Sequence, residues 1–256
     1  MLQENSAKLT QAFIFAAGRG ERMRPLTDIV PKPLVKILGK EILQYSVDKL
    51  NEIDSIQKII INGFYLSDQV KKFIEKQHNP KIIFSQENEK IETGGALVFA
   101  QDKINLKKPL LIINGDILWR EESNDSQIKK IWQAWLEIKK HDNNCEILLG
   151  LKAKNKYHGY DGIGDFELLP KNQIRKDNKI NSHAYVGLAI IDPIILQRKP
   201  QDQSFSLSYF FKEKLSNNGD INNIRAIELS ANFFHIGDIA AIKNSADILQ
   251  KVLQKS

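Results

Sequence analysis

Gly18-Arg19-Gly20-Glu21-Arg22-Met23-Arg24-Pro25-Leu26-Thr27 is the stretch that decides the fold of this chain, and Pro31-Lys32-Pro33 follows it closely. It comes directly after an apolar run, Ala12–Ala17, which predicts a buried β-strand. Glycine tolerates backbone angles that other residues resist, and it has no side chain to hold a ligand away. Gly18 and Gly20 would therefore let main-chain N–H groups approach phosphate oxygens. A strand, a glycine-rich loop and fixed cations in this order predict a polyphosphate site.

The cations of this stretch suit the same ligand. Arg19, Arg22 and Arg24 can each engage two oxygens at once. Lys32 lies between two prolines that fix φ, so its ammonium group would be held at a set position. The dinucleotide fingerprint needs a third glycine where this chain has Met23, and the P-loop needs a Gly-Lys-Ser/Thr sequence that is absent. Two common phosphate loops are thus excluded, while the glycines alone would leave an ordinary strand-to-helix turn open.

The full string resembles the signature of the sugar-nucleotide pyrophosphorylases, the nucleotidyltransferases that make NDP-sugars. The resemblance extends from Ala12 to the C-terminus. The later segments that carry it are Glu92-Thr93-Gly94-Gly95-Ala96, Asn114-Gly115-Asp116, Gly164-Asp165-Phe166 and Tyr185-Val186-Gly187. Within the family, the order and spacing are most similar to those of the uridylyltransferases that use N-acetylmuramate 1-phosphate.

The resemblance implies the reaction NTP + sugar 1-phosphate → NDP-sugar + pyrophosphate, with UTP and N-acetylmuramate 1-phosphate as the favoured substrates. The attacking phosphate is already ionised at neutral pH, so catalysis depends on positioning and on neutralising charge. By resemblance, Arg22 would stabilise the leaving pyrophosphate, and Lys32 would bridge the α-phosphate and the sugar phosphate. The residues implied to bind the nucleotide are Ala17, Gly18, Gly20, Glu87, Thr93, Gly94 and Gly95. Those implied to bind the sugar are Asn114, Asp165, Phe166 and Gly187.

Asp116 ends an apolar strand, where a carboxylate is costly unless it is paired. Mg²⁺ prefers few carboxylates together with phosphate oxygens, so Asp116 is expected to hold Mg²⁺. A turn or helix-cap aspartate is the alternative. Relatives usually have a second metal-binding aspartate where this chain has His235. Because imidazole is a poorer Mg²⁺ ligand than carboxylate, His235 is expected near the metal and its direct ligation is left open. Asp238 would cap the last helix or supply the carboxylate from a shifted position.

Short apolar strands alternate with amphipathic helices in the first half of the chain. The expected strands there are 12–17, 58–62, 81–85 and 110–114, and the expected helices are 41–53, 66–76 and 94–101. Such alternation predicts a parallel sheet with helices on both faces and ligands beyond the carboxyl ends of strands. The second half predicts a helix at 126–140, whose aromatic stripe would pack in the core, strands at 146–151, 165–169, 183–191 and 232–236, and a closing helix at 239–253. The resemblance implies a Rossmann-like three-layer α/β/α fold with a mixed, mostly parallel central sheet.

The length of 256 residues, with 42% hydrophobic and 27% charged residues, fits one large globular domain. We expect a single nucleotidyltransferase domain over residues 1–256. Its nucleotide-binding half would be 12–116, its sugar-phosphate half 117–236, and its C-terminal helix 237–256. We also expect a monomer or a homodimer.

The net charge of +6 is spread over many lysines, so no nucleic acid partner is expected. No apolar run approaches membrane-spanning length, so no membrane partner is expected either. The single cysteine, Cys145, and the polar N-terminus favour a cytoplasmic location. Two other functions stay open. One is guanylyl transfer to a mannose- or heptose-type 1-phosphate. The other is a non-catalytic nucleotide-sugar sensor, in which His235 marks the loss of metal chemistry, although the intact Arg22, Lys32 and Asp116 argue against it.

Overall fold

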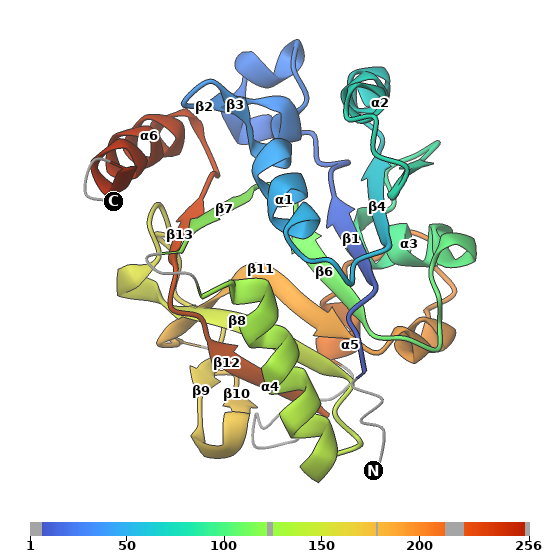
Figure 1. Cartoon of the computed structure of the whole chain (residues 1–256). Coiled ribbons are helices and arrows are strands. Elements are labelled where there is room, and N and C mark those ends of the chain that lie inside the picture. Colours follow the sequence, from blue (N-terminus) through green and yellow to red (C-terminus); the bar gives the residue numbers. More distant parts are fainter. Residues whose placement is uncertain (1–6, 122–124, 178, 213–222, 254–256) are drawn as a thin grey trace.

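Apolar strands form a seven-stranded central sheet in the computed structural model, which describes residues 7–121, 125–177, 179–212 and 223–253 (Figure 1). Its order is β12 (Ile224–Glu228), β8 (Ile147–Ala153), β11 (His183–Ile191), β6 (Leu110–Asn114), β1 (Gln11–Phe15), β4 (Lys58–Gly63) and β5 (Ile82–Gln86). In this sheet β11 pairs antiparallel with both of its neighbours, and all other pairings are parallel. The prediction of a mixed, mostly parallel sheet is confirmed.

Alternate residues of the strands feed two separate cores. On β1, Ala12 and Ile14 belong to one core and Phe13 to the other. Helices α1 (Ile42–Asn51), α2 (Ser67–Lys76) and α4 (Gln127–His141) contribute to the first core, and α3 (Glu92–Phe99) and α5 (Tyr209–Lys212) to the second. Successive side chains of a strand point to opposite faces, so helices cover both faces of the sheet. The three-layer prediction is confirmed, as is the packing of the α4 aromatic stripe, since Trp135 is 2% exposed.

Smaller elements complete the architecture. The two-residue strands β2 (Lys36–Ile37) and β3 (Lys40–Glu41) pair, as do β9 (Glu167–Leu168) and β10 (Ile174–Arg175). Strand β7 (Ile117–Arg120) pairs antiparallel with β13 (Asn232–His235), and α6 (Ile239–Leu253) follows. A third core lies between α6, β7, β13 and the segment that follows β1. The prediction of a strand over 165–169 was wrong in extent, because only 167–168 form β9. Strands β7 and β12 were not predicted.

The carboxyl ends of β1, β4, β5 and β6 meet at one edge of the sheet (Figure 1). Parallel strands place the residues that follow them side by side. The glycine-rich loop after β1, Phe64 after β4, Glu87 after β5 and Asp116 after β6 are thereby brought together from distant parts of the sequence.

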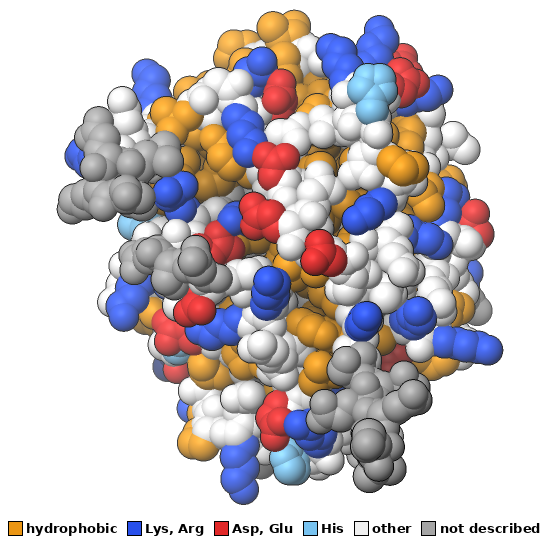
Figure 2. All heavy atoms as spheres, in the orientation of Figure 1, with side chains coloured by type: hydrophobic (Ala, Val, Ile, Leu, Met, Phe, Trp, Pro, Cys, Tyr) orange, Lys and Arg blue, Asp and Glu red, His pale blue; other side chains and the backbone are white. Residues whose placement is uncertain are grey.

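The central sheet runs through both expected halves of the chain, because β8, β11 and β12 continue it beyond β6. Acidic and basic side chains are interspersed on the face seen in Figure 2. Within the described ranges, no helix combines the length and the apolar character needed to cross a bilayer.

Candidate active site

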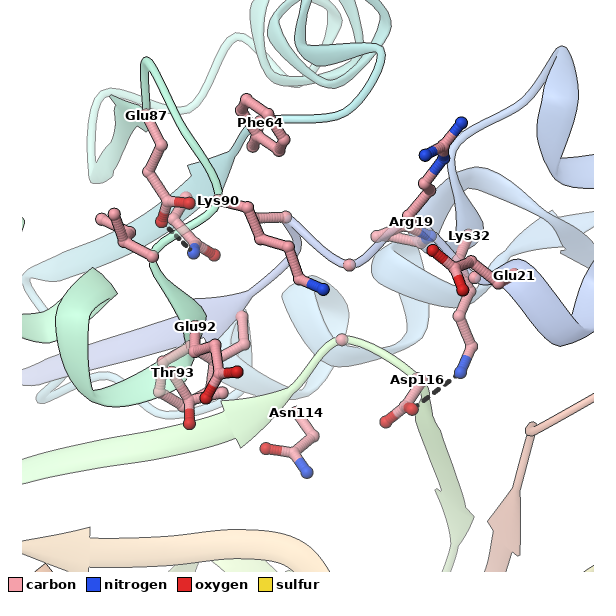
Figure 3. Close-up of a pocket in the computed structure, with 18 of the residues that line it drawn as sticks. Arg19, Glu21, Lys32, Phe64, Glu87, Lys90, Glu92, Thr93, Asn114 and Asp116 are labelled. Carbon is pink, nitrogen blue, oxygen red and sulfur yellow. Dashed lines mark hydrogen bonds and ion pairs between the residues drawn. The ribbon is translucent and has the colours of Figure 1, made fainter. Parts of the chain in front are cut away.

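A cavity of about 670 Å³ opens at the carboxyl edge of the sheet. Its lining combines the glycine-rich loop, the ends of β1, β4 and β6, and the segment from Glu87 into α3 (Figure 3). Of the residues expected to act on a substrate, nine lie in this lining: Ala17, Gly18, Gly20, Arg22, Lys32, Glu87, Thr93, Asn114 and Asp116. Residues separated by up to about a hundred positions therefore share one cavity.

The two glycines of the loop are needed for different reasons. Gly20 has φ +68°, and a Cβ there would lie 2.9 Å from the Cβ of Lys32. The carbonyl oxygen of Gly20 accepts hydrogen bonds from the N–H of Met23 and from the hydroxyl of Thr27. A Cβ at Gly18 would meet no protein atom within 4 Å. Gly20 is thus fixed by the fold itself, whereas Gly18 leaves open space beside the cavity.

The cationic side of the cavity is built from Arg19, Arg22 and Lys32. The Lys32 ammonium lies 2.8 Å from Oδ2 of Asp116, with the two side chains 11% and 30% exposed. The Arg19 guanidinium lies 5.2 Å from the centre of the Tyr65 ring. Fixed cations in a partly buried cavity attract anions more strongly than in open water, so this side suits phosphate groups.

The opposite side holds a buried carboxyl (Figure 3). Oε1 of Glu87 accepts a hydrogen bond of 2.6 Å from Nδ2 of Asn62, and Oδ1 of Asn62 accepts one from the N–H of Ala16. Glu87 is 5% exposed, and burial raises the pKa of its carboxyl to about 6 while the hydrogen bond from Asn62 lowers it. Phe64 lines the same side. An apolar ring beside a hydrogen-bonding group suits a nucleobase better than a phosphate.

Gly94 and Gly95 do not line the cavity. Their N–H groups donate to the carbonyl oxygen of Phe205 at 2.8 and 3.0 Å. A Cβ at Gly94 would overlap the Phe205 ring, and one at Gly95 would overlap the carbonyl of Gln203. These glycines therefore allow a segment before α5 to pack on α3. Thr93 contacts both the cavity and this segment. It lines the cavity, and its hydroxyl oxygen accepts a hydrogen bond from the N–H of Leu207.

Only some of the amino acids expected to bind the sugar lie in or against the cavity lining. Asn114 lines the cavity, and Gly187, with φ +79°, lies behind it, since a Cβ there would lie 2.8 Å from the Cβ of Asn114. Asp165 accepts a hydrogen bond from the N–H of Tyr185. Phe166 is 5% exposed and belongs to a core. The structure therefore places Asp165 and Phe166 outside the cavity lining, and their role toward a sugar stays a prediction.

His235 lies next to the cationic side without lining the cavity itself. It pairs with Ile117 at the start of β7, beside Asp116. A Cβ at Gly237 would lie 2.9 Å from Nε2 of His235 and 3.3 Å from a terminal nitrogen of Arg22, so these two side chains approach each other. Burial lowers the pKa of His235, Asp116 raises it, and Lys32 and Arg22 lower it further.

The donor set fits one Mg²⁺ ion that is shared with a substrate. In the part of the chain that the structure describes, no three His, Cys, Asp or Glu side chains gather to form a metal cage. Asp116 nevertheless presents a carboxylate to the cavity beside phosphate-attracting cations. Mg²⁺ is commonly held by one or two carboxylates, with substrate phosphates and water as its other ligands.

Some lining residues were not predicted from the sequence. Asn62, Phe64 and Lys90 belong to the cavity. Asn62 ends an apolar run, as Asp116 does, and the rule that ligands bind beyond strand ends could have identified it. No comparable pattern marks Lys90, whose position depends on the course of the loop after Glu87.

Comparisons with known proteins agree with this geometry. A family model described as Nucleotidyl transferase matches residues 11–162. The N-acetylmuramate alpha-1-phosphate uridylyltransferase of Caulobacter vibrioides is 29% identical over 89% of this chain and 91% of its own length. The enzyme of the same name from Neisseria meningitidis is 32% identical over 72% of this chain and 75% of its own length.

The fold is also found among solved structures. A glucose-1-phosphate thymidylyltransferase, described as putative in that structure, from Bacillus anthracis has a TM-score of 0.72, 17% identity and coverage of 94% of both chains. The family model covers more than half of this chain and includes the glycine-rich loop, Lys32, Glu87 and Asp116. The resemblance inferred from the motifs is confirmed, and the chain belongs to the nucleotidyl transferase family.

Proposed function

We propose that this chain transfers a nucleotidyl group from an NTP to a sugar 1-phosphate, releasing pyrophosphate. The observation that carries the proposal is one cavity lined by Gly18, Arg22, Lys32, Asp116 and Glu87. Figure 3 shows Lys32 and Asp116 on the side away from Glu87. The cationic side of the cavity suits the triphosphate and the sugar phosphate, and its other side suits a base. The family of the chain supports the same reaction class.

The proposed reaction is one displacement at the α-phosphorus. An oxygen of the sugar phosphate forms a bond to the α-phosphorus, and the bond from the α-phosphorus to the bridging oxygen of the β-phosphate breaks. That oxygen leaves as part of pyrophosphate with the electron pair. The attacking oxygen is already ionised, so no side chain needs to remove a proton. The role of this chain is to align two anions and to neutralise their charge.

In the proposal, Lys32 and Arg22 neutralise different phosphate groups. The Lys32 ammonium is held by Asp116 in the cavity and can exchange part of this contact for phosphate oxygens. Arg22 reaches toward the segment after β13, where it would bind the β- and γ-phosphates. Asp116, with His235 nearby, would hold Mg²⁺. The bound ion would add positive charge at the phosphates where negative charge develops. Ala17, Gly18 and Gly20 would line the triphosphate.

UTP and N-acetylmuramate 1-phosphate remain the favoured substrates. The supporting observation is the similarity along most of the chain to two enzymes that carry that substrate in their names. A specific feature favours the guanylyl alternative. An ionised Glu87 carboxylate accepts hydrogen bonds, and guanine presents adjacent N–H donors on its Watson–Crick edge, whereas uracil presents one donor and two acceptors.

A substrate panel tests both proposals. Purified protein with Mg²⁺ would be given each of four NTPs with N-acetylmuramate, mannose, heptose and glucose 1-phosphates, and pyrophosphate release would be followed. We expect turnover with UTP and N-acetylmuramate 1-phosphate to exceed that of other pairs. The highest kcat/KM with GTP and a mannose- or heptose-type phosphate would instead establish the alternative. Nucleotide binding with no turnover in any combination would contradict both and support the sensor.

Glu87→Gln tests, in the same substrate panel, whether this carboxyl selects between uracil and guanine. A glutamine amide offers one donor and one acceptor, which match uracil, so the ratio of kcat/KM for UTP to that for GTP should rise about tenfold or more. Glu89→Gln, an exposed change in the same loop, is the matched control and should leave the ratio unchanged. An unchanged ratio in the Glu87 variant would remove Glu87 from base selection.

A further inference from the structure

Glu92 has an unusual backbone conformation inside the cavity lining. Its φ is +53°, in the left-handed region, although it is not a glycine. An L-residue with a long side chain is disfavoured there by contact between its Cβ and its own backbone. Glu92 opens α3 directly before Thr93, and both line the cavity. Such residues gather where the surrounding structure holds them for a function.

The Glu92 side chain makes no contact that would explain its identity by stability alone. Among the described residues, no hydrogen bond or ion pair holds its carboxylate, and the residue is exposed to the cavity. Glu87, by contrast, is buried and hydrogen-bonded to Asn62. The favourable interaction of a carboxylate with the start of a helix would explain an acidic residue here, but it does not require a left-handed backbone.

The position of Glu92 limits what its carboxylate can bind. Figure 3 shows it on the side of the cavity away from Arg19 and Lys32, below Glu87 and toward Asn114. A carboxylate that faced phosphate groups would be repelled by them. A carboxylate only accepts hydrogen bonds, so its partners must be hydrogen-bond donors. In a cavity for a nucleotide and a sugar phosphate, the ring hydroxyls are the neutral donors between the base and the phosphates.

We infer that the Glu92 carboxylate is a specificity-determining group that accepts hydrogen bonds from ring hydroxyls of a bound substrate. The inference rests on the proposed function. The hydroxyls belong either to the ribose of the NTP or to the sugar of the sugar phosphate. Glycine would adopt this backbone without strain, and of the seven described non-glycine residues with a positive φ, Glu92 is the one that lines the cavity.

The test pairs Glu92→Gly with substrates that lack single hydroxyls. The glycine variant keeps the backbone conformation and removes the carboxylate. Loss of a hydrogen bond to a charged group should raise KM or lower kcat/KM by about 10- to 100-fold. In the ribose arm, wild-type protein should bind 2′-deoxy or 3′-deoxy NTP at least about tenfold more weakly than the NTP. The Glu92→Gly variant should lose that difference. In the sugar arm, deoxy sugar phosphates are compared in the same way by kcat/KM.

His78→Gly is the matched control. His78 also has a left-handed φ, of +48°, and is exposed outside the cavity lining. Its glycine variant should leave all kinetic constants unchanged. Loss of hydroxyl discrimination in one arm, in Glu92→Gly only, supports the inference and identifies the source of the hydroxyls. Equal discrimination by wild type and Glu92→Gly in both arms overturns it.

Failure of the proposed function would look different. The ribose arm can be measured by calorimetric titration of the nucleotides alone, without turnover. Wild-type protein that binds NTP but turns over no sugar phosphate would contradict the proposed function, and the nucleotide titrations would still support or overturn the role of Glu92 toward the ribose. Turnover in wild type with unchanged discrimination in Glu92→Gly would contradict only the inference.

Discussion

The buried carboxyl of Glu87 gives the folded protein a pH dependence that can be isolated by Glu87→Gln. Burial raises its pKa from an ordinary value of 4.5 to about 6. The folded state therefore binds its proton more tightly than the unfolded state. An acid with a raised folded pKa contributes stability that is present below pH 4.5 and is lost as pH rises through 6. The glutamine variant lacks this titration.

The size of the effect follows from the two pKa values. A pKa unit corresponds to about 1.4 kcal/mol, so the whole loss is about 2 kcal/mol. By the same linkage, about 1 kcal/mol of it falls between pH 5 and pH 7.5. Gln can still accept the hydrogen bond from Nδ2 of Asn62 through its side-chain oxygen. Substitution should therefore remove the cost of burying a charge and retain the contact.

Urea denaturation without nucleotide, at pH 5 and pH 7.5, measures the effect. The free energy of unfolding of Glu87→Gln minus that of wild type should rise by about 1 kcal/mol between the two pH values. Glu89→Gln, on the exposed part of the same loop, should show no such rise. A difference for Glu87→Gln that stays constant, or falls, as pH increases would refute the argument that burial dominates at this carboxyl.

Three further predictions address the site and its support. Lys32→Ala should lower kcat by about 10²- to 10³-fold with the fold intact by circular dichroism, whereas Lys36→Ala, an exposed neighbour, should not; equal turnover by both variants would remove Lys32 from the mechanism. His235→Asp should keep or lower the Mg²⁺ concentration for half-maximal activity, because carboxylate suits Mg²⁺ better than imidazole, and complete loss of activity would show a special role for the imidazole. Gly94→Ala should lower the free energy of unfolding by about 1–3 kcal/mol through overlap with the Phe205 ring, and unchanged stability would contradict this packing role.

The elements that sequence reasoning found are those whose signal is local. The apolar run before Gly18 and the alternation that follows it predicted strands β1, β4, β5 and β6, and with them the edge where the cavity lies. The cations were found in the glycine-rich stretch and in the Pro31-Lys32-Pro33 segment after β1, and Asp116 was found because it closely follows β6. These features depend on patterns within a dozen residues, which a single sequence displays.

The features that were missed depend on tertiary contacts. Strand β12 is short and becomes a strand by pairing with β8, far away in the sequence. Gly94 and Gly95 were expected at the nucleobase, but the space that a glycine leaves there is filled by residues 203–205, which no local pattern could show. The left-handed φ of Glu92 likewise has no signal in the local sequence. Sequence patterns located the site but not the contacts that shape it.

The central claim is that one cavity aligns two anions for direct displacement at the α-phosphorus. The most direct measurement uses one pure diastereomer of an NTP in which sulfur replaces a non-bridging oxygen of the α-phosphate. The protein converts it with the favoured sugar 1-phosphate and Mg²⁺, and ³¹P NMR determines the configuration at phosphorus in the NDP-sugar. A single in-line displacement predicts inversion of configuration. Retention would show two successive displacements through a covalent intermediate on the protein, and would contradict the account.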